Sequence, residues 1–286
     1  MSLQQGSHAS EPQPITKQVV ATLRLPWTSL LSREDLSLHV GRYPRMSWHV
    51  PSTQSYLVAG PWRNRSDVVE VLETRGERHR SGLWHRLLAD RAEAYGAVLV
   101  DPAEYRSATG FYRDAGVGML EEVLVLRTST LSGFTVEQTI EVQPMRNRGI
   151  DELMRIDRDA FPWLWWNCRE EFEEYLDTPG VTMWVALRND EVLGYVGITQ
   201  LREWGHIDRL AVRPRFQGNG YGTQLLAWAL QRLHDAGAQY AQLSTQESNE
   251  RSQRLYQRFG FRQTRGSYKL FGLVLKKPVS GGGTSV

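Results

Sequence analysis

Three glycines lie close together in residues 217–223, which read Gln-Gly-Asn-Gly-Tyr-Gly-Thr. The segment follows a run typical of a strand and opens a run with the apolar spacing of a helix. Glycines in such a turn let backbone N–H groups approach an anion at the positive end of the helix dipole. The pattern indicates a cradle for phosphate or pyrophosphate. Its residues are Gln217, Gly218, Asn219, Gly220, Tyr221, Gly222 and Thr223.

Two common phosphate loops do not fit this segment. A nucleotide-triphosphate loop requires a lysine followed by serine or threonine, and no lysine is present. A dinucleotide loop requires its third glycine one position after Gly222. A glycine-rich turn can also be purely structural, so the interpretation depends on a second motif.

The second motif is a helical face near the C-terminus. Asn249, Ser252 and Tyr256 are spaced three and four residues apart and so share one side of a helix, followed by Phe259-Gly260-Phe261. This spacing places an amide, a hydroxyl and a phenol in one row.

Together the two motifs resemble the GNAT superfamily of N-acetyltransferases. The family's acyl-CoA loop has Gln or Arg, two residues, Gly, one residue, and then Gly or Ala. Gln217, Gly220 and Gly222 match it, with Leu210-Ala211-Val212 upstream. The resemblance covers residues 135–277. It implies the acyl-CoA N-acyltransferase fold, a mixed α/β fold whose central, mostly antiparallel sheet is flanked by helices. It also implies acetyl-CoA as cosubstrate and no metal.

The resemblance implies roles for the helical face and for the strand before the loop. Asn249 and Ser252 would contact the cofactor, as would Leu210, Ala211 and Val212, and Tyr256 would be the general acid. Collapse of the tetrahedral intermediate expels a thiolate of pKa ~8.5, which a nearby phenol of pKa ~10 can protonate. Tyr256 could instead be a core aromatic residue.

An amine nucleophile needs a base, because it arrives mostly protonated at neutral pH. Glu203, His206 and Asp208 are the candidates, and the last two project to the same side of a strand. Histidines or carboxylates at these two positions often serve as the base in the family, so we favour His206, followed by Asp208. A structural role for His206 stays open. The resemblance also implies that the N–H of Leu210 or Ala211 stabilises the oxyanion.

Four aromatic residues surround a proline between two expected helices. Phe161, Trp163, Trp165 and Trp166 could form a lid or an apolar acceptor pocket, or they could be core residues. Cys168, the only cysteine, is expected to be an inert core thiol.

Strand-like and helical runs alternate along the chain and predict an α/β fold. In the C-terminal half the segment 204–212 is an expected strand that ends before Pro214, and a helix is expected within 218–236, ending at Gly237. The other expected strands are 55–60, 68–72, 97–100, 121–126, 136–144, 183–188, 192–201, 240–245 and 268–275, and the other expected helices are 83–95, 107–114, 150–161, 169–176 and 249–258.

The first half repeats the C-terminal pattern in a degenerate form. Gly82 aligns with Gly220 and Tyr112 with Tyr256, at offsets that rise from 138 to 144, so two GNAT-like domains in tandem are expected. Trp84 replaces Gly222 and would place an indole where backbone must meet pyrophosphate. We therefore predict that the first half does not bind CoA and that Tyr112 only packs. Its remaining roles are to scaffold the active half, cover a sheet edge or wall the acceptor cleft, and we favour the scaffold.

Composition excludes several classes. Hydrophobic residues at 41% and charged residues at 23% are ordinary for a globular chain. No apolar run is long enough to span a membrane or act as a signal peptide, and one cysteine allows no internal disulfide, so we expect a cytoplasmic protein without a membrane partner. A net charge of +2 gives no reason to expect a nucleic-acid partner, and the basic cluster around residues 75–91 fits a solvated face.

The sequence thus predicts an acetyl-CoA-dependent N-acetyltransferase that acts on a primary amine of a small molecule or peptide by direct attack in a ternary complex. A non-catalytic acyl-CoA-binding or regulatory module is the alternative, and an interaction scaffold is a third. We expect a monomer or homodimer. The expected domains are a flexible arm (1–14), the degenerate copy (15–130), the catalytic domain (135–277) and a flexible tail (278–286).

Overall fold

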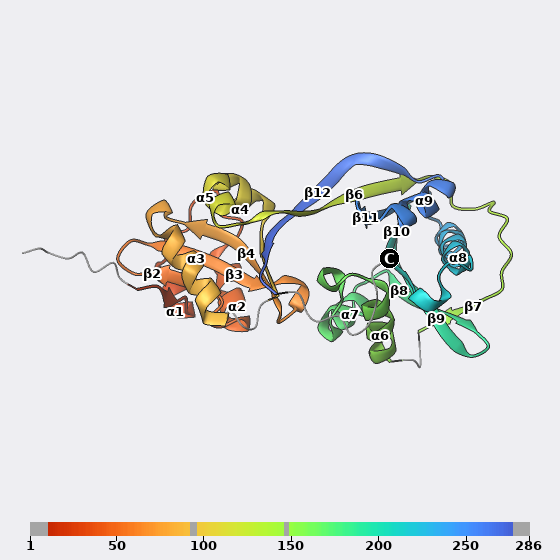
Figure 1. Ribbon diagram of the computed structural model, residues 1–286, viewed down its shortest axis with the longest axis horizontal. Coiled ribbons are helices and arrows are strands. Elements are labelled where there is room, and N and C mark those ends of the chain that lie inside the picture. The colour runs from red at the N-terminus through yellow and green to blue at the C-terminus, as the bar shows by residue number, and fades with distance from the viewer. Residues whose placement is uncertain (1–10, 92–95, 146–148, 277–286) are drawn as a thin grey trace, which may run out of the picture. The chain divides into compact units, whose positions relative to one another are not determined.

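The computed structural model describes residues 11–91, 96–145 and 149–276 (Figure 1). Its described residues divide into two compact units, the first comprising 11–120 with 270–276 and the second comprising 121–269. Of the expected arm, residues 1–10 lie outside the described part, whereas Gln13–Pro14 form a short strand, β1. The expected tail, 278–286, also lies outside it.

The first unit has the strand order β1-β2-β3-β4-β5-β12. Its pairs are antiparallel except β4 with β5, which run parallel and are connected by α3. Its elements are β1 (Gln13–Pro14), α1 (Lys17–Thr22), α2 (Arg33–Arg42), β2 (Trp48–Val50), β3 (Ser55–Pro61), η1 (Trp62–Asn64), β4 (Val68–Arg75), α3 (Glu77–Arg91), β5 (Ala97–Val100), α4 (Pro102–Ser107), α5 (Thr109–Asp114) and the end of β12 (Arg262–Val274).

The second unit has the strand order β6-β11-β10-β9-β8-β7. Again one pair is parallel, β10 with β11, and α8 connects its two strands. Its elements are β6 (Gly118–Thr128), β7 (Glu141–Pro144), α6 (Ile150–Ala160), η2 (Trp163–Trp165), α7 (Arg169–Leu176), β8 (Val181–Arg188), β9 (Glu191–Leu201), β10 (Trp204–Val212), η3 (Pro214–Phe216), α8 (Tyr221–Asp235), β11 (Tyr240–Gln246), α9 (Glu250–Arg258) and the start of β12.

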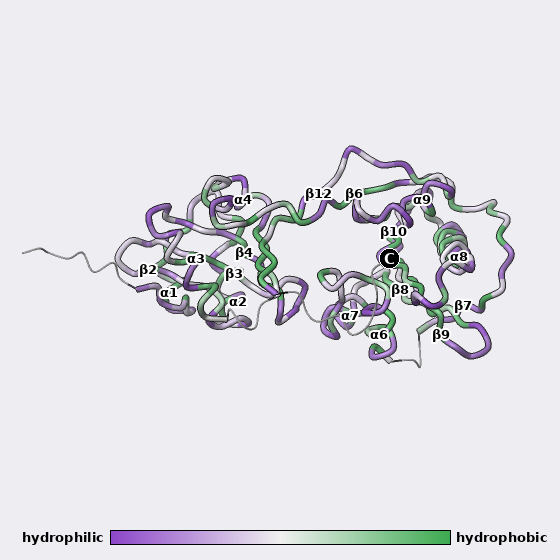
Figure 2. Tube along the Cα trace, viewed as in Figure 1, coloured by the Kyte–Doolittle hydropathy of each residue, from purple (hydrophilic) through white to green (hydrophobic). Residues whose placement is uncertain are grey.

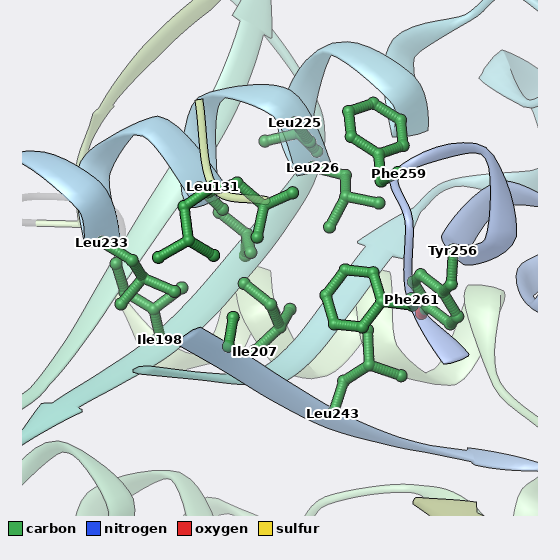
Figure 3. Packing of buried hydrophobic residues seen from close by; sticks show 14 of the residues in the cluster. Leu131, Ile198, Ile207, Leu225, Leu226, Leu233, Leu243, Tyr256, Phe259 and Phe261 are labelled. Atoms are coloured by element: carbon green, nitrogen blue, oxygen red, sulfur yellow. The ribbon is translucent and has the colours of Figure 1, made fainter. Parts of the chain in front are cut away.

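Helices cover both faces of the second unit's sheet. On one face, leucines of α8 pack with Tyr256 of α9 and with Ile207 and Leu243 of the sheet (Figure 3). On the other face, α6 and α7 enclose a separate core that includes Leu153 and Phe172. The expected mixed α/β fold with a mostly antiparallel sheet is confirmed, and the repetition of the parallel crossover confirms the tandem arrangement.

The last strand of each half of the sequence pairs with a strand of the other half. In the repeat, β6 of the first half corresponds to β12 of the second half. The structure pairs residues 271–274 of β12 with β5, and residues 123–128 of β6 with β11. Each half of the sequence therefore supplies the strand that lies beside the other half's parallel pair.

Several expected elements differ from those observed. The expected strands 183–188 and 192–201 are joined by a turn in which Asn189 and Asp190 both have positive φ, and this turn is hydrophilic in Figure 2. Helix α3 begins at Glu77 instead of residue 83, and β12 begins at Arg262 instead of residue 268. The sequence pattern did not predict β1, β2 or the helices α1, α2 and α4.

Candidate active site

Strands β10 and β11 begin side by side and then part. Residues 204–207 pair in parallel with residues 240–243, and the described ladder contains no further pairing between the two strands. Beyond that point β10 stays paired with β9 up to Val212, with a register shift at Asp208. Strand β11 stays paired with β6. The opening between the two strands thus lies directly after Ile207.

Alternate backbone amides of β10 face this opening. The N–H of Arg213 donates to the carbonyl oxygen of Leu193 on β9 at 2.9 Å. Because N–H groups alternate in direction along a strand, the N–H of Ala211 also points toward β9, and that of Leu210 points to the side that β11 has left. A Cβ on Gly194 would lie only 2.1 Å from the Ala211 carbonyl oxygen, which places that peptide edge against β9. Of the two expected oxyanion donors, the geometry favours Leu210.

The glycine loop enters α8 through two left-handed residues. Gly218 has φ +86° and Gly220 has φ +78°, and an added Cβ would meet nothing within 4 Å at either, so the backbone conformation itself requires glycine. Within the described chain no side chain caps α8, and its first turn has no acidic residue. The N–H groups of Tyr221, Gly222 and Thr223 therefore lie uncapped at the positive end of a 15-residue helix.

The other loop side chains hold the turn together. The Gln217 amide donates to a carbonyl oxygen at the end of β10 at 2.8 Å and accepts a hydrogen bond from Arg251 of α9. Asn219 donates to a carbonyl oxygen within the turn at 3.1 Å. Tyr221 is buried and its hydroxyl is bonded to Arg188, so only its backbone can belong to the cradle.

Asn249 is the N-cap of α9, a function that the sequence analysis did not assign to it. Its side-chain oxygen accepts from the N–H of Ser252 at 3.2 Å. Tyr256 lies one helical turn after Ser252 and is only 8% exposed. Its ring lies 5.9 Å from that of Phe261 (Figure 3). Burial raises the pKa of Tyr256 to about 12, although a hydrogen bond with Ser252 lowers it. The phenol therefore keeps its proton at any physiological pH.

His206 and Asp208 form a hydrogen-bonded pair on β10. The distance between Nδ1 of His206 and Oδ1 of Asp208 is 2.7 Å, and both side chains are about one-fifth exposed, at 23% and 20%. This confirms that the two side chains share one side of the strand. Glu203, the third candidate, is exposed.

The other oxygen of Asp208 is also occupied. It accepts hydrogen bonds from the hydroxyls of Tyr175 on α7 at 2.6 Å and Thr199 on β9 at 2.8 Å. Tyr175 can reach it because Gly197 has no side chain, since a Cβ there would lie 2.6 Å from the phenolic oxygen. Burial and the Asp208 carboxylate raise the pKa of Tyr175 above its ordinary value. The Asp208 carboxylate thus accepts hydrogen bonds and has none to donate to His206. This favours the His206 tautomer with the proton on Nδ1, which donates to Asp208, and a lone pair on Nε2.

The sequence analysis missed a buried charge pair next to this site. Arg209, between Asp208 and Leu210, binds Asp157 of α6, whose side chain is 0% exposed. One signal was present, because Asp157 stands four residues after Leu153 on the apolar face of its helix. Nothing in the sequence indicated that Tyr175 and Thr199 would meet Asp208.

The first unit lacks the features of this loop. Gly82, aligned with Gly220, lies inside α3 and is absent from the positive-φ residues of the described chain. Helix α3 also has Glu77 in its first turn, which repels an anion. We expected the indole of Trp84 to occupy the helix start, and this prediction was wrong. Trp84 is buried against Tyr112, with ring centres 5.7 Å apart, and the Tyr112 hydroxyl donates to Glu104 at 2.7 Å.

The described residues contain no group of three or more His, Cys, Asp or Glu side chains that could hold a metal ion. None of their helices is long and apolar enough to cross a membrane.

Comparison with known proteins agrees with this geometry. Residues 150–261 match the model of the acetyltransferase (GNAT) family. The chain is 33% identical over 148 residues to the aminoalkylphosphonate N-acetyltransferase of Salmonella typhimurium, covering 49% of this chain and 89% of that protein. It is 28% identical over 205 residues to the mycothiol acetyltransferase of Brachybacterium faecium, covering 64% of this chain and 60% of that protein.

A solved tandem GNAT protein from the clavulanic acid biosynthesis pathway has the same fold. It aligns with a TM-score of 0.51 at 13% identity, covering 93% of this chain and 98% of that one. The fold and the parted strands are those of the acyl-CoA N-acyltransferase fold. The chain belongs to the GNAT family of N-acetyltransferases, and this membership implies an acyl-CoA cosubstrate.

Proposed function

We propose that this protein transfers the acetyl group of acetyl-CoA to a primary amine of a small molecule by direct attack in a ternary complex. The observation that carries the proposal is the arrangement of β10. One strand carries the His206–Asp208 pair and, beyond the point where β11 parts from it, the outward N–H of Leu210 and the entrance to the glycine loop.

In this mechanism Nε2 of His206 accepts the proton of the ammonium form or of the attacking amine, directly or through water. Asp208 stabilises the imidazolium that results. The N–H of Leu210 donates to the oxygen of the tetrahedral intermediate. When the C–S bond breaks, the hydroxyl of Tyr256 donates a hydrogen bond to the departing thiolate, and Asn249 with the loop 217–223 holds the cofactor.

Substitution of His206 tests the base. We expect His206→Gln to lower kcat by roughly 10²- to 10⁴-fold, the range for loss of a general base, with acetyl-CoA affinity unchanged. Asp208→Asn should also lower kcat, because an amide cannot accept all three hydrogen bonds. Thiol release and calorimetric titration measure the two effects, and Glu203→Gln, an exposed neighbour, is the matched control. An active His206→Gln variant would remove this residue from the mechanism.

The burial of Tyr256 favours one alternative, a non-catalytic acyl-CoA-binding module, because a tyrosine in the core need not act on the thiolate. The two functions differ in one experiment. The module binds acetyl-CoA at one site per chain and releases no thiol with any acceptor, whereas the enzyme releases thiol with at least one. Aminoalkylphosphonates, short peptides and polyamines form the acceptor panel, since related enzymes are named for the first class.

We further propose that residues 135–277 form the catalytic half and residues 15–130 a scaffold that does not bind CoA. The continuous helix α3, with Glu77 in its first turn, supports this division. Binding of one acetyl-CoA per chain in calorimetry is the expected result, and a stoichiometry of two would contradict it.

A further inference from the structure

A buried ion pair joins α6 to β10. Nε of Arg209 lies 2.6 Å from Oδ1 of Asp157, and Nη2 lies 2.9 Å from Oδ2, so the contact is bidentate. The Tyr195 hydroxyl also binds Asp157 and accepts a hydrogen bond from Arg209 at 2.9 Å. The Asp157 side chain is 0% exposed and that of Arg209 is 12% exposed.

The same pair holds residues 161–167, which we call the aromatic loop. Arg209 donates to the carbonyl oxygen of Trp165 at 2.6 Å, and Asp157 accepts from the N–H of Asn167 at 2.8 Å. The guanidinium carbon lies 4.0 Å from the centre of the Phe161 ring. The beginning, middle and end of the loop are thus each attached to one of the two charges.

The loop therefore lies against the part of β10 that carries the proposed chemistry. The register shift at Asp208 lets two successive residues, Asp208 and Arg209, bind partners on α7 and α6, which cover the same face. His206 bonds to Asp208 and so belongs to this face as well. The aromatic loop and His206 therefore lie on the same face of the sheet.

Stability alone gives little reason for such a pair. Desolvation of two buried charges roughly cancels their attraction, so apolar residues of similar size would serve the fold as well. What the pair adds is geometry, because a planar fork fixes a carboxylate, a carbonyl group and an aromatic ring at once.

We propose that Asp157 and Arg209 are positioning residues that fix the aromatic loop over the acceptor side of the active site, and that Phe161 thereby limits which amines can reach His206. The proposal rests on the function proposed above. It predicts that loosening the pair weakens acceptor use and size selection, while acetyl-CoA binding on the α8 side is unaffected.

Cys168 provides a reporter that does not depend on activity. It is the only cysteine, it directly follows the aromatic loop, and it is partly buried. In Arg209→Lys and Asp157→Asn we expect its reaction with a thiol reagent such as dithionitrobenzoate to accelerate about tenfold, because a broken buried pair releases the loop. Arg155→Lys, on the exposed side of α6, is the matched control and should react like the wild type.

Kinetics provide the second measurement. With an amine that the panel identifies, we expect KM for the acceptor to rise about tenfold in Arg209→Lys, with KM for acetyl-CoA changed less than twofold. Phe161→Leu leaves the ion pair intact, so it tests the role of the ring even if the variants of the ion pair misfold. It should raise kcat/KM for the bulkier amines of the panel relative to the smaller ones.

The outcomes separate the two proposals. If the wild type uses no amine, the proposed function fails, and the Cys168 rates still decide whether the pair fixes the loop. Folded pair variants with wild-type Cys168 rates would overturn the positioning role. A Phe161→Leu variant with unchanged selectivity would overturn the role of the ring.

Discussion

Replacing Tyr256 by phenylalanine distinguishes proton donation from hydrogen-bond donation to the departing thiolate. The pKa of Tyr256 is about 12 because the ring is buried, whereas that of a thiol is about 8.5. Complete proton transfer is therefore uphill by about 3.5 pKa units, or about 5 kcal/mol. A hydrogen bond to a charged group contributes about 1.5–3 kcal/mol, which corresponds to a loss of roughly 10- to 150-fold in kcat for Tyr256→Phe.

The assay is thiol release at saturating acetyl-CoA and acceptor between pH 6 and about 10, with calorimetry to confirm that acetyl-CoA affinity is retained. Wild type and variant should give pH profiles of the same shape, because a group with a pKa of about 12 does not ionise in this range. Tyr240→Phe, on β11 of the same unit, is the control for a hydroxyl lost from a residue outside the proposed site.

Three results would refute this reasoning. A loss greater than about 10⁴-fold in kcat would mean that the phenol transfers a proton outright, because a hydrogen bond alone does not supply so much. Unchanged kcat would make Tyr256 a core residue only. An alkaline limb near pH 10 that disappears in Tyr256→Phe would show that burial does not raise this pKa as described.

Three further predictions concern the two units. Gly220→Ala, at φ +78°, should weaken acetyl-CoA binding at least about tenfold in calorimetry, whereas Gly82→Ala, in mid-helix, should leave it unchanged and stabilise the fold by about 0.5–1 kcal/mol. Burial raises the pKa of Glu70 to about 7, so its contribution to stability is present below about pH 4.5 and lost as pH rises through 7. Glu70→Gln should therefore increase the free energy of unfolding by about 3 kcal/mol at pH 8 and leave it nearly unchanged at pH 4.5, as measured by urea titration. A fragment that starts at residue 135 lacks β6, which pairs with β11, so it should aggregate in size-exclusion chromatography, while one that spans residues 116–269 should stay monomeric.

The elements that the sequence predicted best are those with strong stops. Helix α7 and strand β10 have the predicted bounds, because residues 179–180 and Pro214 break the chain just beyond them. The hydrophobic pattern did not predict elements whose side-chain polarity differs from that typical of their secondary structure. Residues 262–267 are mostly polar yet form the start of β12, which lies next to β6 in the order of the sheet. Helix α2 has weak amphipathic contrast, and its one clear signal was the capping box of Ser32 and Asp35.

The site was predictable only where local sequence determines it. Positive φ at Gly218 and Gly220 follows from the glycine pattern, and the pairing of His206 with Asp208 follows from the alternation of a strand. The sequence favoured His206 over Asp208 as the base, but the contact that supports this proposal comes from Tyr175, on a helix some thirty residues away in sequence. The direction of the Leu210 amide depends on the pairing of β10 with β9, which no spacing of residues reveals.

The two halves differ most at the start of the helix that crosses each parallel pair. In α8 the helix begins after Gly220, so its first N–H groups have no capping side chain in the described chain and no acidic neighbour. In α3 the helix continues through the aligned segment, and Glu77 occupies the positive end. A helix that begins nearly two turns earlier therefore lacks the uncapped start that α8 has, while the crossover itself is retained. The parallel pair survives in the first half because its strands and their buried faces, rather than the loop, hold the crossover together.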